Sequence, residues 1–211
     1  ILNVNKNVAF ILISGNAVAM PWEKDVPAIV QTWYLGSEGG NAIANVLTGA
    51  VNPSGKLPFS FPKKLEDNAA HSFGRLSYPG DSINQYYKED ILVGYRWFDT
   101  KKIAPQFAFG YGLSYTTFEY GKITTDKTAY KADETIKISF TLKNTGKVDG
   151  AEAVQVYASQ PKASVMRPAK ELKAFTKVFL KAGETQTVSL EVKVKDMAFY
   201  NEKSMSWTVE P

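Results

Sequence analysis

The sequence of 211 residues contains no cysteine and a single histidine, His71. The lack of thiols excludes disulfides, zinc–thiolate sites and cysteine nucleophiles. A metal centre or a Ser-His-Asp triad is disfavoured too, because His71 would be the only imidazole available. We interpret His71, which stands in a polar stretch, as a solvent-exposed loop residue. Neither a metal nor a cofactor is therefore expected.

Long apolar runs and concentrated charge are also scarce. The longest uninterrupted apolar run covers residues 8–13, whereas a membrane-spanning helix needs about 20 such residues. The net charge is +4, and the lysines are spread along the chain rather than gathered into the basic stripe typical of nucleic-acid binders. We therefore expect no membrane span and no nucleic-acid partner. The apolar share of 44% and the charged share of 22% are typical of a soluble globular protein.

The first part of the chain, residues 1–62, alternates strand and helix patterns. The apolar runs at 8–13 and 26–34 are typical of strands buried on both faces of a parallel sheet. Residues 41–49 carry apolar side chains at helical spacing, and the first of them, Asn41, is the expected N-cap. Residues 57–62 predict a short edge strand. These elements make up part of an α/β domain, because too few strands are present to complete its sheet.

The middle segment, residues 63–120, combines a polar half with an aromatic half. Residues 63–85 show little periodicity and predict a long connecting loop. Residues 86–120 are dense in tyrosine, phenylalanine and tryptophan. We expect these rings to pack in a cleft between two domains, with a sugar-stacking surface as the alternative.

The last segment, residues 121–211, has the pattern of an all-β domain. Within 136–142, Ile136, Ile138, Phe140 and Leu142 alternate with polar residues, so they are predicted to face a core. Residues 181–184 are interpreted as a hairpin connection. Further strands are expected at 153–157, 172–180, 187–194 and 206–209. This spacing favours an immunoglobulin or fibronectin type III-like β-sandwich, which we expect to lack its last strand.

Four stretches in this order resemble family 3 glycoside hydrolases. They are Met20-Pro21-Trp22, the glycine-rich 36–49 running into 52–58, residues 87–99, and residues 107–118. Two further segments, 143–146 and 171–175, are similar to parts of the fibronectin type III-like domain that ends many proteins of this family. Because the similarity covers the chain from end to end, it is far more specific than a single glycine pattern.

The resemblance implies a (β/α)8-type barrel, then an α/β sandwich, then a β-sandwich. Members are mostly retaining exo-β-glycosidases, including β-glucosidases and β-xylosidases, in which two carboxyl groups lie about 5–5.5 Å apart. The resemblance places the Asp nucleophile on the barrel and the Glu acid/base upstream of Val8. We therefore expect a structural C-terminal portion, inactive alone, whose partner is the N-terminal barrel-containing part and whose substrate is a β-linked glycoside. A periplasmic or secreted bacterial location is favoured by the same resemblance.

No carboxylate of this chain is assigned a catalytic role. Glu38 superficially resembles an acid/base loop residue, but it precedes the predicted helix, where a carboxylate can accept backbone N–H bonds. Glu89 and Asp90 are neighbours, and neighbouring side chains of an extended segment point to opposite faces. We expect them to pair with Arg96 or a lysine.

Substrate contacts are expected from the loop around residues 63–87, which would approach the mouth of the cleft. The candidate contacts to a leaving-group sugar are Trp22, Arg75, Tyr78 and Tyr86.

Two other functions compete with this interpretation. One is a stand-alone, non-catalytic carbohydrate-binding or adhesion protein built on the β-sandwich. It is disfavoured because an incomplete α/β part would expose a large apolar sheet face. The other is an autonomous enzyme that uses Glu38 or Glu89, for which the sequence supplies no complete site.

Overall fold

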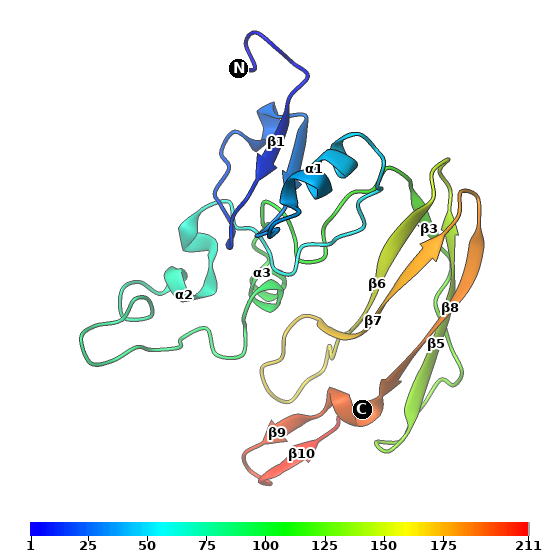
Figure 1. Ribbon diagram of the computed structural model, residues 1–211. Helices are drawn as coiled ribbons and strands as arrows, with labels where there is room; N and C mark the ends of the chain where they lie inside the picture. Colours follow the sequence, from blue (N-terminus) through cyan, green and yellow to red (C-terminus); the bar gives the residue numbers. More distant parts are fainter. Residues whose placement is uncertain (211) are drawn as a thin grey trace. The chain divides into compact units, whose positions relative to one another are not determined.

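A computed structural model describes residues 1–210, which fold as two compact units (Figure 1). The first unit contains residues 1–51 and 56–111. The second contains residues 52–55 and the chain from Gly112 onward. The predicted order, an α/β part followed by an all-β part, is confirmed. The division of the chain at residues 62 and 120 stays a prediction.

The first unit is built on two short parallel strands. β1 (Ala9–Leu12) pairs in register with β2 (Ala28–Gln31), which confirms both predicted strands. The connection between them holds the 3-10 turn η1 (Glu23–Asp25), and α1 (Gly39–Leu47) follows β2. None of the helices within residues 1–210 combines the length and the apolar character that crossing a bilayer requires.

The helix α1 begins three residues earlier than the predicted N-cap, Asn41, implies. Glu38 is its N-cap and Asn41 lies in its first turn, so the prediction of Asn41 as the N-cap is wrong. The earlier start depends on a close approach at Gly39, where a Cβ atom would lie 2.8 Å from Leu35 Cβ. Only a glycine fits at that distance.

Residues 57–61 run beside residues 106–111 without forming the predicted edge strand. The Leu57 N–H donates to Tyr111 O (2.8 Å) and the Phe61 N–H donates to Phe107 O (2.7 Å). The pairing is nevertheless a single antiparallel bridge between Phe61 and Phe107. Prolines at 58 and 62 explain this outcome, because they remove two backbone donors from a segment of six residues.

The segment 63–85, predicted as a long connecting loop, contains two short helical turns. They are η2 (Leu65–Asp67) and α2 (Ala69–Ser72), and α3 (Tyr95–Lys101) follows further along the chain. Trp97 organises this region, because its buried indole donates from Nε1 to Asp67 O (3.0 Å) and packs against Phe73. An α3 of seven residues is too short to show a helical period in the sequence.

His71 lies in α2, and the prediction of an exposed loop residue is wrong. Its ring centroid is 4.6 Å from that of Tyr78, and its Nδ1 atom is buried. The imidazole is half-buried because residues 73–87 fold back so that Tyr78 covers it.

The second unit is a β-sandwich. In one sheet β5 is central and pairs with β3, β4 and β8, and in the other β6 pairs with β7. The strands are β3 (Phe118–Tyr120), β4 (Thr124–Thr125), β5 (Thr135–Asn144), β6 (Gly150–Ala158), β7 (Glu171–Leu180) and β8 (Thr185–Lys193). The turn η3 (Val194–Met197) and the hairpin of β9 (Phe199–Asn201) and β10 (Ser206–Thr208) follow.

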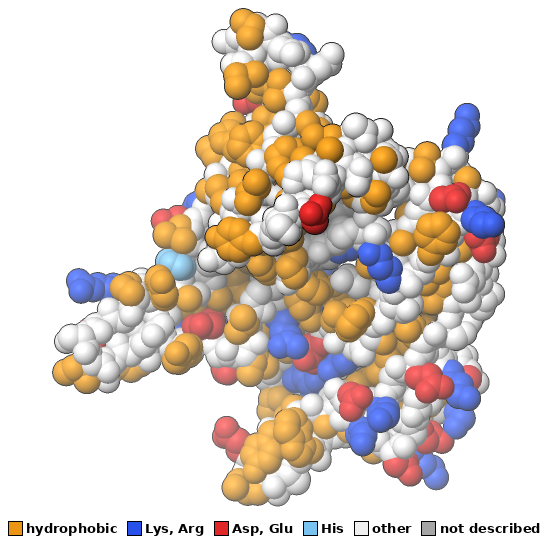
Figure 2. Space-filling view, viewed as in Figure 1, with side chains coloured by type: hydrophobic (Ala, Val, Ile, Leu, Met, Phe, Trp, Pro, Cys, Tyr) orange, Lys and Arg blue, Asp and Glu red, His pale blue; other side chains and the backbone are white. Residues whose placement is uncertain are grey.

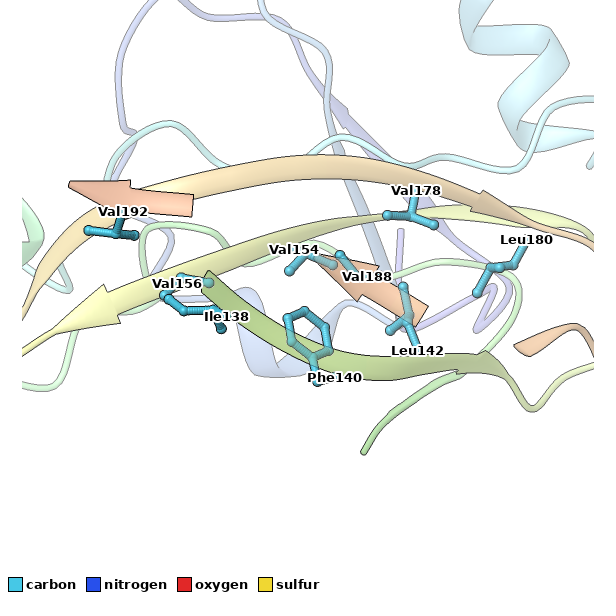
Figure 3. Packing of buried hydrophobic residues seen from close by; sticks show 9 residues of the cluster. All are labelled: Ile138, Phe140, Leu142, Val154, Val156, Val178, Leu180, Val188 and Val192. Carbon is cyan, nitrogen blue, oxygen red and sulfur yellow. The ribbon is translucent and has the colours of Figure 1, made fainter. Parts of the chain in front are cut away.

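The core of the sandwich consists of apolar side chains from both sheets (Figure 3). The predicted alternation on β5 is confirmed, since Ile138, Phe140 and Leu142 are buried and Ile136 packs against them. The remaining buried members of this core are Val154, Val156, Val178, Leu180, Val188 and Val192.

The connection at 181–184 is not a hairpin, contrary to the prediction. β7 pairs with β6 while β8 pairs with β5, so these four residues carry the chain from one sheet to the other. Leu180 and Val188 consequently enter the core from opposite sheets. A crossing of this kind is a normal Greek-key connection of β-sandwiches.

Candidate functional site

The carboxyl ends of β1 and β2 define one edge of the first unit, because the two strands are parallel. We call residues 14–22, which follow β1, and residues 32–38, which follow β2, the carboxyl edge. In open α/β sheets ligands bind outside the carboxyl ends of the strands. We therefore expect substrate contacts at the carboxyl edge.

Polar side chains tie the two halves of the carboxyl edge together. The Thr32 hydroxyl donates to Leu12 O (3.1 Å), and Gln31 Nε2 donates to the carbonyl and hydroxyl oxygens of Ser14 (3.2 and 3.3 Å). Gln31 Oε1 is buried and accepts no hydrogen bond from the described residues. These hydrogen bonds connect the two segments of the carboxyl edge, and Gln31 Oε1 is the acceptor that they leave without a partner.

The chain turns sharply at Trp33, which has a φ of 58°. This left-handed conformation is costly for a bulky residue and persists only where the surroundings hold it. Here the indole packs against Phe59 and Phe61, with centroid distances of 5.2 and 6.2 Å. The next residue, Tyr34, is 80% exposed.

Trp22, the first predicted substrate contact, lies on the carboxyl edge. Its segment is held by Gln106, whose Nε2 donates to Met20 O (2.6 Å) and whose Oε1 accepts from Met20 N (3.4 Å). The Trp22 ring is half-buried against Phe10, at a centroid distance of 4.5 Å.

The other three predicted contacts, Arg75, Tyr78 and Tyr86, lie together on residues 73–87, which we call the arm. The Gly80 N–H donates to Arg75 O (2.8 Å), and the Tyr86 N–H donates to Leu76 O (3.0 Å), so the arm doubles back on itself. All three side chains are exposed. In Figure 2 the arm projects at the lower left, where orange apolar side chains are scattered among white ones.

The tip of the arm is ordered by Asp81. Its Oδ1 accepts the backbone N–H groups of Ile83 (2.7 Å) and Asn84 (2.5 Å). These bonds favour the carboxylate, with Asn84 contributing most, and hold the pKa of Asp81 below its ordinary value. The tip therefore has a defined shape rather than that of a random loop.

The carboxylates discussed from the sequence differ from their predicted contacts. Glu38 Oε2 accepts from Asn41 Nδ2 (2.6 Å) and makes no side-chain cap to the helix backbone, so the predicted backbone contact is wrong. Glu89 Oε2 is buried and has no hydrogen-bond partner in the described chain. The expected pairing of Glu89 and Asp90 with Arg96 or a lysine stays a prediction. Residues 87–92 form consecutive turns, so the extended segment expected around Glu89 and Asp90 is not present.

The second unit also contains a cavity, of about 640 Å³, lined by Tyr130 and several charged side chains. The charges are already engaged, since Arg167 contacts Glu171 (2.9 Å) and Met197 O (3.1 Å), and Lys173 donates to Asp196 O (2.8 Å). No group of acidic or imidazole side chains within residues 1–210 is arranged to hold a metal ion.

The sequence predicted four candidate substrate contacts, Trp22, Arg75, Tyr78 and Tyr86. It did not single out three residues that belong to the carboxyl edge or contact it, namely Tyr34, Gln31 and Gln106. A tyrosine between an apolar strand and a glycine-rich turn was a usable signal for Tyr34. Gln106 could not be recognised from a local pattern, because its partner Met20 lies 86 positions away in the sequence.

Two family models match this chain. The model of the glycosyl hydrolase family 3 C-terminal domain matches residues 1–115, and that of a fibronectin type III-like domain matches residues 152–211. Among curated proteins, beta-glucosidase BoGH3A of Bacteroides ovatus is 56% identical over the whole chain. Thermostable beta-glucosidase B of Acetivibrio thermocellus is 44% identical over 210 residues. The chain spans 28% and 27% of the lengths of these two relatives.

Solved structures agree with this assignment. The β-glucosidase DesR of Streptomyces venezuelae, in complex with D-glucose, matches 98% of the chain with a TM-score of 0.91 and 38% identity. A β-glucosidase of Kluyveromyces marxianus matches 99% with a TM-score of 0.91 and 45% identity. The chain covers 26% and 24% of those two structures. With one family model covering more than half of its length and relatives matched from end to end, the chain belongs to glycoside hydrolase family 3.

Proposed function

We propose that this chain is the C-terminal structural portion of a retaining exo-β-glycosidase that hydrolyses terminal β-linked sugars. The observation that carries the proposal is the 56% identity with a β-glucosidase over the whole chain. That relative extends well beyond the matched region, since the chain spans 28% of it. Family resemblance assigns the nucleophilic Asp and the acid/base Glu to the part that precedes this chain.

The chain's own carboxylates support this division of labour. Retaining hydrolysis needs one carboxylate that attacks the anomeric carbon and a second that transfers a proton to the leaving oxygen. Glu38 is exposed and bonded to Asn41, whereas Glu89 is partly buried in a run of turns. The chain instead supplies part of the α/β domain that must hold the acid/base loop in position, and small errors of position there are expensive in rate.

The arm and Trp22 are proposed to contact the leaving-group sugar. Tyr78 and Tyr86 are each 50% exposed, and Arg75 lies on the same arm. Aromatic rings can cover the apolar face of a pyranose, and a guanidinium can donate to its hydroxyl groups. These contacts would act on the leaving group rather than on the terminal sugar that reacts.

The activity is tested by assaying the 211-residue chain and the full-length protein with aryl β-glucosides and β-xylosides. We expect turnover only from the full-length protein, because both reacting carboxylates lie outside this chain. Turnover by the chain alone would overturn the assignment and return attention to Glu38 and Glu89. An inactive full-length protein that is folded would contradict the proposed activity itself.

The arm is tested in the full-length protein with Arg75→Ala and Tyr78→Ala. We expect KM for a β-linked trisaccharide to rise about fivefold in each variant, because exposed contacts of this kind contribute about 1 kcal/mol. Hydrolysis of a glycosyl fluoride, which has no leaving-group sugar, should be unchanged. Lys162→Ala, at an exposed lysine of the β-sandwich, is the control. Unchanged kinetics on the trisaccharide would remove the arm from the substrate-binding surface.

A further inference from the structure

The chain passes between its two units at three places. It leaves the first unit after Val51, returns to it at Lys56, and enters the second unit again at Gly112. Residues 52–55, which we call the strap, are therefore a short piece of the second unit placed within the sequence of the first. Compact units are normally joined by a linker that few contacts cross, so this extra passage is unusual.

Asn52 fixes the strap to the β-sandwich with its side-chain amide. Its Oδ1 accepts from the Ser114 hydroxyl (2.9 Å) and from the Tyr115 N–H (2.8 Å). Its Nδ2 donates to Asp149 O (2.9 Å). We call Asn52 and these three partners the clasp. Because Ser114 and Tyr115 precede β3 whereas Asp149 precedes β6, the clasp connects the approaches to strands of the two different sheets.

The clasp is supported by the interior of the β-sandwich. The Ser114 hydroxyl oxygen accepts the Thr116 N–H (3.3 Å), and the Thr116 hydroxyl donates to the buried Asn144 (2.5 Å). The buried Gly150 lies against the amide from the other side, because a Cβ atom there would lie 2.7 Å from Asn52 Nδ2. A glycine within a strand often marks such a close approach. The Asn52 amide is therefore held by hydrogen bonds and by packing.

The strap and the passage at Gly112 enclose residues 56–111. While the clasp holds, both ends of this segment stay attached to the second unit. Fixing both ends of a long segment removes conformational freedom from its unfolded state, as a disulfide or a metal clip does. The unfolded form of residues 56–111 is therefore disfavoured, although every residue of the clasp belongs to the second unit.

We propose that the clasp is a conformational lock, which stabilises the folded state of residues 56–111 in the first unit by closing their loop on the second unit. The lock acts through the continuity of the chain and requires no contact between the two units. It gives the β-sandwich a part in keeping the preceding α/β segment folded. Because the inference does not rest on catalysis, its test needs no substrate.

The test is native-state hydrogen exchange of the full-length protein, followed by mass spectrometry of its peptides, which measures how often each unit opens. Peptides with the bonded N–H groups of Phe61 and Gly110 report on the first unit, and peptides of β5 and β8 report on the second. Asn52→Ala should raise the exchange rates of both sets about tenfold. The β-sandwich responds to its lost hydrogen bonds, and residues 56–111 respond to the opened loop.

Two variants weaken the clasp without changing Asn52. Gly150→Ala places a Cβ atom against Asn52 Nδ2 and should give the same pattern. Ser114→Ala removes a single hydroxyl and should give a smaller rise in both sets, so it also answers the question if Asn52→Ala does not fold. The control is Asn201→Ala, whose side-chain bonds stay within its own hairpin. It should leave exchange in the first unit unchanged.

The proposal is overturned if Asn52→Ala speeds exchange in the second unit alone, because Asn52 would then be a local contact of the β-sandwich. It is equally overturned if neither set of peptides changes. An acceleration of the first unit by Asn201→Ala as large as that by Asn52→Ala would overturn it too. Faster exchange in both units with Asn52→Ala, and an unchanged first unit with Asn201→Ala, is the result that supports the lock.

Discussion

Asn144 shows how one buried polar side chain can be fully satisfied. It is 0% exposed. Its Oδ1 accepts from the Thr116 hydroxyl (2.5 Å) and the Gly146 N–H (3.1 Å), and its Nδ2 donates to Val148 O (2.8 Å) and Leu180 O (3.2 Å). All four hydrogen-bonding positions of the amide are therefore used. The side chain links the end of β5 to the end of β7 and to the turn between β5 and β6.

Asn144→Ala should lower the free energy of unfolding of the β-sandwich by about 3 kcal/mol. The reason is that it leaves several buried donors and acceptors without partners, each at a cost of about 1–3 kcal/mol. Urea unfolding followed by circular dichroism of the β-sheet signal measures the change. The control Asn201→Ala breaks bonds to the exposed N–H groups of Lys203 and Ser204, which water can replace, and should cost less than about 1 kcal/mol. Equal losses in the two variants would contradict this account.

At the scale of elements, β7 illustrates why a strand of the sandwich has two distinct faces. Leu180 is completely buried, whereas its neighbour Phe179 is 59% exposed. Successive side chains of a strand point to opposite faces of the sheet. The smaller residue therefore contributes more to the core than the larger one beside it.

We expect Leu180→Ala to destabilise the β-sandwich by about 2–5 kcal/mol, because it removes buried methyl groups and leaves a cavity. Phe179→Ala is the matched control on the same strand and should cost less than about 1 kcal/mol. Chemical unfolding of both variants under the same conditions measures the two losses in the free energy of unfolding. A larger loss for Phe179→Ala would mean that its outward face is covered by another part of the protein.

For the whole molecule, hydrogen bonding to carboxylates determines the response to acid. The carboxylates with a lowered pKa in the described chain are Asp81, Asp126, Glu134 and Glu210. In Asp126 the main cause is the hydrogen bond from the Tyr130 hydroxyl, followed by that from the Lys137 N–H. A pKa lower in the folded than in the unfolded state stabilises the fold above the unfolded pKa. That contribution is lost as the pH falls through the folded pKa.

The melting temperature should therefore fall as the pH is lowered from about 4 towards 2, the range below the ordinary pKa of carboxyl groups. Asp126→Asn should lower the melting temperature at pH 7 and reduce the further fall in acid, because one linked proton is removed. Thermal unfolding at a series of pH values measures both effects. An acid response identical to that of the unmodified protein would show that the Asp126 carboxylate is not linked to folding.

The local pattern of the sequence was sufficient to predict much of the fold and to name candidate site residues. Alternation on β5 reports which of its side chains are withdrawn from water, and the apolar runs of β1 and β2 form strands as predicted. Trp22, Arg75, Tyr78 and Tyr86 could be named because large rings and a guanidinium near glycine and proline turns are typical of binding loops. Whether they bind substrate stays a proposal.

Only the tertiary structure decided which partners meet. That β7 and β8 join different sheets, that Gln106 holds Met20, and that Tyr34 lies over Gly15 depend on contacts between residues distant in sequence. A periodic pattern encodes whether a residue is buried, because burial depends on its own position along a strand or helix. It does not encode which segment covers that residue, because several apolar faces of similar chemistry compete for the same surface. The sequence by itself thus determined the family and the order of the two folds, and the packing of distant segments determined how the carboxyl edge is held together.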